Sequence, residues 1–167
     1  FNSIKEILAK ANEEKSGDML AEIGARTAAE RVAAKVVLAD LTLEDLRNNP
    51  VIDPEDDEIS RISLEQINEK AYKKIKSMPL GSFREFLLSA DTDQIKEIHE
   101  GLTAEMIAGV TKLMSNMDLI TTSAKIPVTA TCNTTIGLPG TFAGRLQPNH
   151  ARDDIDGIMA SIYEGIS

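Results

Sequence analysis

The stretch FAGRLQPNHARDD, residues 142–154, combines a short apolar run with a proline and the start of a helical pattern. The run predicts a strand, and the residues from Pro148 onward predict a turn that leads into a helix. Side chains two positions apart in a strand point to the same face, so Arg145 and Gln147 would project together and Leu146 would point the other way. A strand followed by an amphipathic helix is half of a βαβ unit, which indicates the first repeat of an α/β sheet or a (β/α)8 barrel.

Arg145 and Gln147 would lie at the carboxyl end of that strand, where barrels and open α/β sheets place their ligand sites. A guanidinium and an amide can together bind a small polar substrate through several donors and one acceptor. The structural alternative is an arginine paired with a carboxylate and a glutamine bonded to backbone. The pattern alone leaves both interpretations open, and it indicates no catalytic residue beside them.

The helix predicted over residues 152–167 should lead to a second, parallel strand, yet the sequence stops at Ser167. A lone buried strand would leave its backbone donors and acceptors unpaired, which is costly. The sequence also starts at Phe1 without a methionine. We therefore expect the chain to be a piece of something longer.

The residues before 126 carry a different signal, in which apolar side chains recur at spacings of three and four. We expect helices over about residues 4–11, 18–23, 27–41, 64–78, 82–88, 92–100 and 103–123, with a further helix start at Asp53-Pro54. The chain is thus predicted to be mainly α and to have two parts. These are a helical region over residues 1–125 and a first βα unit over residues 126–167.

Two capping boxes are predicted, at Thr27 with Glu30 and at Ser82 with Glu85. The methionine and isoleucine stripe of residues 103–123 is expected to be core, because such a stripe at helical spacing is more often core than a binding groove. The helix after Thr27 is expected to bury one face, formed by Val32, Ala33, Val36 and Val37 and extending to Leu41.

Composition and charge exclude several classes of protein. Apolar residues make up 42% of the chain, with four Phe, two Tyr and no Trp, which indicates a globular and largely aliphatic interior. The net charge of −9 would repel a phosphate backbone, so nucleic acid is not expected as a partner. No apolar run is long enough to span a membrane. The single Cys132 is compatible with a reducing cytoplasm and is interpreted as a packed residue rather than a nucleophile.

Other candidate sites are weak. The acidic run at residues 54–58 is interpreted as a solvated helix start, since it has neither a histidine nor the spacing of a calcium loop. His99 is expected to face solvent, and His150 follows the predicted strand without a triad or metal partner. The glycines of residues 136–144 lack the context of a phosphate loop. The sequence therefore predicts no catalytic constellation and no metal site.

Several segments resemble the large subunit of ethanolamine ammonia-lyase. The most specific are NTTIGLPGTF and RLQPN, both within CNTTIGLPGTFAGRLQPNHARDD at residues 132–154. The resemblance continues over nearly the whole chain and in the same order, through KEILAKANEEKSGDMLA, ERVAAKVVLADL, LRNNPVI, GLTAEMIAGVTKLMSN and IYEGIS. It implies a helical N-terminal region leading into a (β/α)8 TIM-type barrel, with FAGRLQPN at the first strand and with Arg145 and Gln147 binding substrate.

The same resemblance implies an activity and its partners. The family converts ethanolamine to acetaldehyde and ammonia by radical chemistry that depends on adenosylcobalamin, so the complete protein is expected to be a carbon–nitrogen lyase. The cofactor would be held mostly by residues beyond this chain, so the chain alone is expected to be inactive. The expected partners are a small subunit and other large subunits, in the cytoplasm or inside a bacterial microcompartment. The alternative hypothesis is that the chain is a non-catalytic helical module that binds other subunits.

Overall fold

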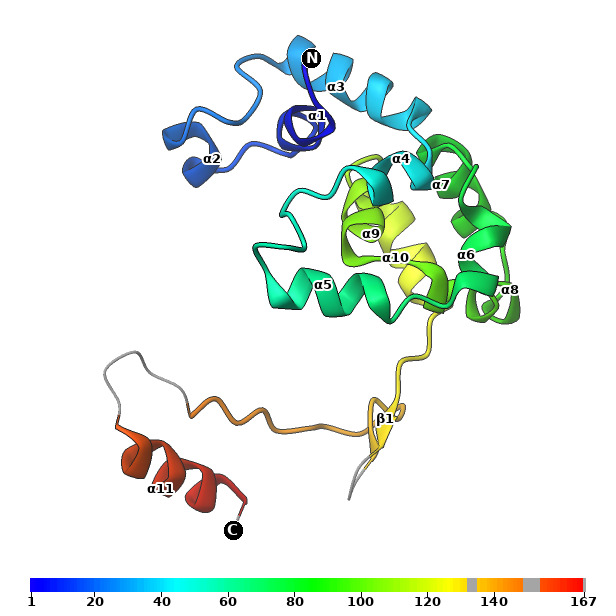
Figure 1. The fold of residues 1–167 in the computed structure, drawn as a ribbon. Coiled ribbons are helices and arrows are strands. Elements are labelled where there is room, and N and C mark those ends of the chain that lie inside the picture. Colours follow the sequence, from blue (N-terminus) through cyan, green and yellow to red (C-terminus); the bar gives the residue numbers. More distant parts are fainter. Residues whose placement is uncertain (132–134, 149–153, 167) are drawn as a thin grey trace. The chain divides into compact units, whose positions relative to one another are not determined.

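The computed structural model describes residues 1–131, 135–148 and 154–166, and these residues fall into two units, Phe1–Ile126 and Pro127–Ser167 (Figure 1). The first unit contains α1 (Ile4–Lys10), α2 (Ser16–Leu20), α3 (Ala28–Asp40), α4 (Leu43–Asn48), α5 (Glu58–Glu65), α6 (Glu69–Ile75), α7 (Leu80–Ser89), α8 (Thr92–Lys96), the 3-10 helix η1 (His99–Gly101), α9 (Ala104–Thr111) and α10 (Asn116–Ser123). The second unit contains β1 (Ala130–Thr131), β2 (Thr135–Ile136) and α11 (Ile155–Ile166). Among the described residues, no helix has the length and apolarity that crossing a membrane requires.

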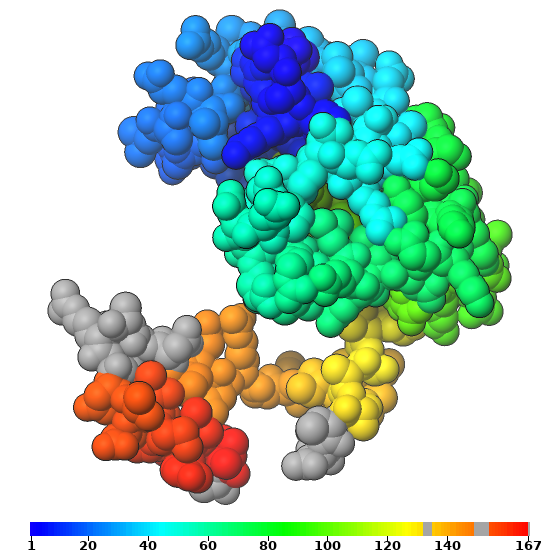
Figure 2. Space-filling model, in the orientation of Figure 1, coloured from blue at the N-terminus to red at the C-terminus, as the bar shows by residue number. Residues whose placement is uncertain are grey.

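Helix α7 contributes to the core of the first unit and packs against α3, α9 and α10. Its Leu80 and Phe83 are fully buried, and the rings of Phe83 and Phe86 stack with their centroids 6.2 Å apart. Figure 2 shows the side chains of this unit as one packed body. The rest of the core is mainly aliphatic, as the composition predicts, and includes Leu38, Leu43, Leu46, Met106 and Val110.

Two of the expected helices are each divided by a cap. The helix predicted over residues 64–78 is interrupted at Asn68, whose side chain accepts hydrogen bonds from the backbone N–H groups of Lys70 and Ala71 and so starts α6. The helix predicted over residues 103–123 is interrupted at Ser115, which forms a capping box with Asp118 at the start of α10. As a result the apolar stripe is only partly core: Met106 is buried, whereas Met117 and Ile120 are exposed.

Two other helix starts differ from those expected. The Ser82–Glu85 capping box is wrong, because α7 already begins at Leu80, after Pro79, and has no side-chain cap. The backbone N–H of Leu80 instead donates to the carbonyl of Leu41 at 2.8 Å, which fixes the earlier start. The start expected at Asp53-Pro54 is also displaced, because α5 is capped by Asp57, which accepts from Ser60 N at 2.7 Å.

Helix α3 begins at the predicted cap, since Thr27 Oγ1 accepts from Glu30 N at 3.1 Å, but Glu30 binds the backbone N–H of Arg26 rather than completing the box. The helix buries a different face from the one expected. Ala34 and Leu38 are fully buried against the core. Of the face predicted to be core, Leu41 is partly buried against it, whereas the other four residues are exposed: Val32, Ala33, Val36 and Val37. Because α3 is apolar around much of its circumference, periodicity alone could not tell which side meets α1 and α7.

The second unit begins with a short antiparallel pair, in which Ala130 lies opposite Ile136 and Thr131 opposite Thr135. The strand expected over residues 142–147 is not seen, because residues 141–148 form neither helix nor strand. A strand is held by hydrogen bonds to a neighbouring strand, and no described segment pairs with this stretch. Because this stretch is exposed, its unpaired backbone N–H and C=O groups can bond to water, and the cost of burying them unpaired does not arise.

Helix α11 confirms the helix predicted near the end of the chain. The carboxylate of Asp154 accepts a hydrogen bond from Gly157 N at 2.6 Å and so caps its first turn. No described residue of α11 is buried, and its apolar face includes Ile155 and Ile166, which are 79% and 72% exposed. The second unit therefore presents apolar side chains that its own described residues do not cover.

Candidate functional site

Arg145 and Gln147 both lie in the exposed stretch of residues 141–148, which carries no regular secondary structure. Leu146, which lies between them, packs closely against Gly165 of α11. A Cβ atom added to Gly165 would lie only 2.4 Å from Leu146 Cδ1. The Leu146 side chain thus points toward α11, and the flanking side chains of Arg145 and Gln147 are exposed to solvent. This alternation is the one expected of an extended chain.

The structural alternative for these two residues finds no support in the described part of the chain. Neither the Arg145 guanidinium nor the Gln147 amide forms a hydrogen bond or an ion pair with another described residue. Both side chains therefore keep their hydrogen-bonding groups available to a ligand. Arg145 offers donors only, whereas Gln147 offers donors and one acceptor oxygen.

The backbone that leads to Arg145 is set by two glycines with positive φ. Leu138 to Thr141 form a turn with Pro139 and Gly140 at its centre, closed by the hydrogen bond from Thr141 N to the Leu138 carbonyl at 3.2 Å. Gly140 has a φ of 73°, as the third position of a type II turn requires. Gly137 has a φ of 92°, and a Cβ there would lie 2.0 Å from the Val128 carbonyl oxygen. Both positions therefore require glycine, which gives the GLPG motif a structural role.

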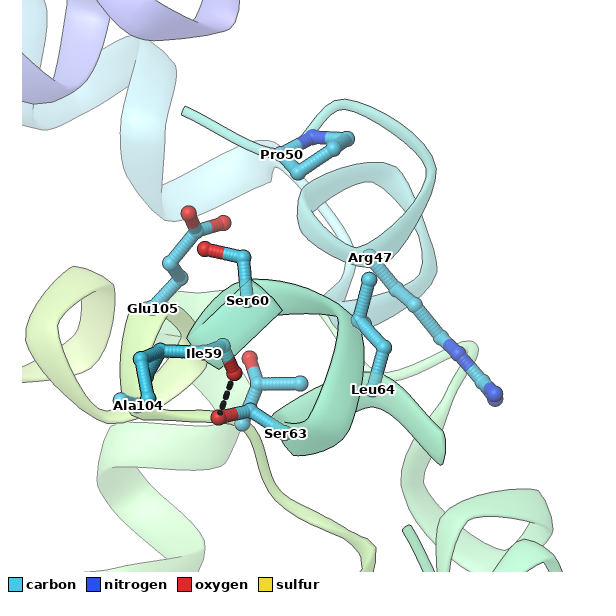
Figure 3. A pocket seen from close by; sticks show the side chains of 9 residues that line it. Arg47, Pro50, Ile59, Ser60, Ser63, Leu64, Ala104 and Glu105 are labelled. Atoms are coloured by element: carbon cyan, nitrogen blue, oxygen red, sulfur yellow. Dashed lines mark hydrogen bonds between the residues drawn. The ribbon is translucent and has the colours of Figure 1, made fainter. Parts of the chain in front are cut away.

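A hollow of about 170 Å³ lies in the first unit, between α4, α5 and the start of α9 (Figure 3). Its lining combines apolar side chains such as Ile59 and Leu64 with the charged side chains of Arg47 and Glu105. Figure 3 shows Ser63 bonded to the Ile59 carbonyl, a hydrogen bond of 2.7 Å within α5.

Both charged groups of this hollow already have partners. Arg47 binds Glu69 and lies over the ring of Tyr72, 4.3 Å from its centroid, and the Glu69 carboxylate raises the pKa of Arg47. The carboxylate of Glu105 accepts a hydrogen bond from Val51 N at 2.9 Å. That contact joins residues 54 positions apart, which no local pattern could predict. The contacts at this hollow attach the loop after α4 to α9. They have a structural role, and we assign no chemistry to the hollow.

Lys112 is a candidate that the sequence did not single out, because it lies within an apolar helical pattern. It borders a second hollow, of about 350 Å³, and donates to the side-chain oxygen of Asn12. Burial lowers the pKa of Lys112, and repulsion by Lys15 and Lys35 adds to the shift. No carboxylate lies within ion-pair distance of this amine among the described residues, and no nucleophile or electrophile accompanies it. Its visible role is to hold the end of α1 against α9.

The remaining candidates supply no site. His99 is exposed, as expected, and its Nδ1 lies 2.7 Å from the Lys96 carbonyl oxygen. Cys132 and His150 lie outside the described residues. Within the described ranges, no group of three or more histidine, cysteine or acidic side chains is arranged to hold a metal ion. Arg145 and Gln147 are therefore the best candidates for contact with a ligand.

Comparison with known proteins identifies relatives over the full length of the chain. The family model of the ethanolamine ammonia-lyase large subunit (EutB) matches residues 1–167. The chain is 52% identical over 169 residues to the ethanolamine ammonia-lyase large subunit of Escherichia coli (strain K12) and 51% identical to that of Salmonella typhimurium (strain LT2). Each alignment covers 100% of this chain and 37% of the relative, so the chain spans a little over a third of the length of these relatives.

Proposed function

This chain belongs to the ethanolamine ammonia-lyase large-subunit family, and from this premise we propose that it forms part of an enzyme that releases ammonia from ethanolamine. Within that enzyme its role is to bind and orient the substrate through Arg145 and Gln147. The observation that supports this role is that both side chains are exposed, lie two positions apart in the chain, and form no hydrogen bond or ion pair with another described residue. The small subunit and other large subunits are the proposed protein partners.

The chemistry of ethanolamine assigns the two side chains to different ends of the substrate. A guanidinium is a permanent cation with donors only, so Arg145 would repel an ammonium group and donate to the hydroxyl oxygen. The amide oxygen of Gln147 can accept a hydrogen bond from the amino group. Two contacts at opposite ends of a small molecule fix its orientation, and orientation can supply a large part of a rate enhancement.

Adenosylcobalamin, the cofactor we propose for the complete enzyme, would supply the radical that removes a hydrogen atom from the substrate. Arg47 and Glu105 in the first hollow and Lys112 in the second already have partners within the first unit, so we do not offer either hollow as its site. Residues outside this chain would hold the cofactor. The residues of this chain would hold the substrate carbon at a fixed position and would take no proton themselves.

The proposed architecture continues the second unit into a (β/α)8 barrel. Residues 142–147 would form the first barrel strand once neighbouring strands from the rest of the large subunit supply hydrogen-bond partners. The uncovered apolar face of α11, with Ile155 and Ile166, supports this proposal because a barrel helix buries such a face against the strands. Arg145 and Gln147 would then share one face at the carboxyl end of that strand, where barrel enzymes place their active sites.

The test uses a complete large subunit in which this chain replaces the matching part of the E. coli subunit, assembled with the E. coli small subunit. Arg145→Ala is expected to lower ethanolamine turnover about a hundredfold or more, because the substrate loses one orienting contact. Arg61→Ala is the control, since Arg61 lies on α5 and its ion-pair partners among the described residues are its helical neighbours Glu58 and Glu65. Unchanged turnover in Arg145→Ala, with assembly intact, would remove the site assignment while leaving the family membership in place.

A second candidate function is that of a helical assembly module. The observation that favours it is that the described residues classed as buried all belong to the first unit, which packs its own core. This function is compatible with the first, because an enzyme subunit can carry both a site and an assembly region. Its test is whether an outer surface of the first unit binds another chain.

A further inference from the structure

Gly165 of α11 lies against the side chain that separates the two proposed substrate contacts. A Cβ atom built on Gly165 would lie 2.4 Å from Cδ1, 2.7 Å from Cδ2 and 3.0 Å from Cγ of Leu146. Carbon atoms in favourable contact are about 3.5 to 4.0 Å apart. The three outer carbons of Leu146 therefore occupy the space that any side chain at position 165 would need.

The backbone at Gly165 does not itself require glycine. Among the described glycines, positive φ angles occur at Gly137 and Gly140, and Gly165 lies within the regular turns of α11. Alanine would suit this backbone better, because glycine is the poorer helix former. The contact with Leu146, rather than the conformation of the chain, is therefore what excludes a side chain at this position.

The same face of α11 carries its half-buried residues. Within the described part of α11, these are Ile158 and Ile162. Residues three, four or seven positions apart share a face of a helix, and Gly165 follows Ile162 by three positions and Ile158 by seven. Leu146 therefore meets the helix on its most covered face, at a position where the absence of a side chain permits close approach.

The position of Leu146 determines how its two neighbours are directed. Successive side chains of an extended chain point to opposite sides, so a leucine fixed against α11 sets Arg145 and Gln147 on the side away from the helix. The planar peptide bonds on both sides of Leu146 couple the three residues. A shift of Leu146 away from α11 would thus also move the guanidinium and the amide.

We propose that Gly165 is a positioning residue for the substrate site. By leaving room for Leu146, it sets how closely residues 145–147 approach α11, and so it fixes the direction of the side chains of Arg145 and Gln147. Gly165 itself touches no substrate, because it lies on the opposite side of the stretch. This inference rests on the substrate contacts proposed for Arg145 and Gln147.

The test uses the chimeric large subunit described above, assembled with the E. coli small subunit and supplied with adenosylcobalamin. Gly165→Ala should lower kcat for ethanolamine about tenfold and raise KM about threefold or more, because small displacements of orienting contacts are costly. A partly unfolded preparation would lower the apparent kcat and leave KM unchanged. A joint change in kcat and KM therefore distinguishes displaced contacts from a loss of folded enzyme.

Leu146→Ala provides the compensating change, since it removes the three carbons that a Cβ atom at position 165 would meet. In the Leu146→Ala background, adding Gly165→Ala should change kcat and KM by less than about twofold, because the obstructing side chain is gone. The four proteins form a double-mutant cycle that isolates this contact. An effect of Gly165→Ala that is equally large with and without the leucine would overturn the proposal.

Gly17→Ala is the matched control. Gly17 is also a helical glycine, on α2, and a Cβ atom added there would meet no atom within 4 Å. This variant should keep both kcat and KM within about twofold of the parent chimera, because the substitution displaces nothing. Gel filtration with the small subunit should show the same assembly for the control and for Gly165→Ala.

The outcomes separate this proposal from the substrate site on which it rests. If Arg145→Ala lowers turnover but Gly165→Ala leaves kcat and KM unchanged, the positioning role is wrong and the substrate site stands. Unchanged turnover in both variants would remove the substrate site and the positioning role together. A Gly165→Ala subunit that fails to assemble would show a role in folding instead, and would also overturn the proposal.

Discussion

Asp118 links helices α7 and α10, and its contribution to the stability of the fold should depend on pH. The carboxylate accepts hydrogen bonds from Ser115 at the start of α10 and binds Arg84 of α7 at 2.6 Å. Bonding to the Ser115 backbone and to Arg84 lowers the pKa of Asp118 below its usual value. The unfolded chain therefore takes up this proton at a higher pH than the folded chain does. The stabilisation is present above the unfolded pKa and is lost as the pH falls through the folded pKa.

Asp118→Asn tests this linkage. At pH 7 the variant should have a lower free energy of unfolding than the wild type, because the amide keeps the cap but loses the charge that binds Arg84. The difference should shrink as the pH falls below about 4, where the wild-type carboxylate is protonated as well. Urea titrations at several pH values measure it, with Asp93→Asn as the control. A difference that stays constant from pH 7 to the acid limit would contradict the assignment.

At the residue scale, the spacing of Arg145 and Gln147 singles them out as a candidate site, and that assignment stays a prediction. The alternation around Leu146 is present, although the expected strand is not. By contrast, Ser115 was not recognised as a cap, because the apolar stripe continues on both sides of it. Cap formation depends on where the chain can turn, and that is set by contacts between helices rather than by the local pattern.

At the scale of elements, the structure differs from the sequence-based expectation mainly in where the helices begin and end. The sequence favoured Ser82 as a cap and gave Ser115 no role, whereas the structure caps α10 with Ser115 and starts α7 before Ser82. Ser115→Ala should lower the free energy of unfolding by about 1 kcal/mol, since the backbone N–H of Asp118 loses its acceptor. Ser82→Ala should be neutral or slightly stabilising, because alanine is the better helix former. Equal losses in the two variants would favour the sequence-based boundary.

The buried face of α3 could not be predicted for a different reason. Its sequence AAERVAAKVVLAD has apolar residues on more than one side, so two faces compete for the core. The structure selects the face of Ala34 and Leu38, and the ion pairs made by Glu30 and Lys35 hold that orientation. A helix with a spare apolar face is what an assembly surface requires.

At the scale of the whole molecule, stability should reside in the first unit. The described residues classed as buried run from Ile7 to Thr122 and so all precede residue 127. A chain that ends at Ile126 is therefore expected to unfold cooperatively, with a free energy of unfolding within about 1 kcal/mol of that of residues 1–167. Thermal and urea unfolding, followed by circular dichroism, compare the two. A shortened chain that is molten or unfolded would show that the second unit contributes to the core.

The second unit is where sequence and structure differ most, and the reason is physical. The sequence of residues 142–147 is suited to a strand, but a strand exists only with a neighbour to bond. In the proposed barrel the exposed apolar face of α11 would have the same cause, since a barrel helix needs strands to cover it. A local pattern favours an element, but the element forms only where it finds hydrogen-bond and packing partners.

The central claim is that this chain can serve as part of an ethanolamine-deaminating large subunit. The most direct measurement is acetaldehyde formation from ethanolamine, with added adenosylcobalamin, by the E. coli large subunit that carries this chain in place of its own matching part, assembled with the small subunit. We expect turnover within about tenfold of the E. coli enzyme, because orienting contacts at the same positions would be retained. A chimera that assembles and binds the cofactor but forms no acetaldehyde would contradict the claim.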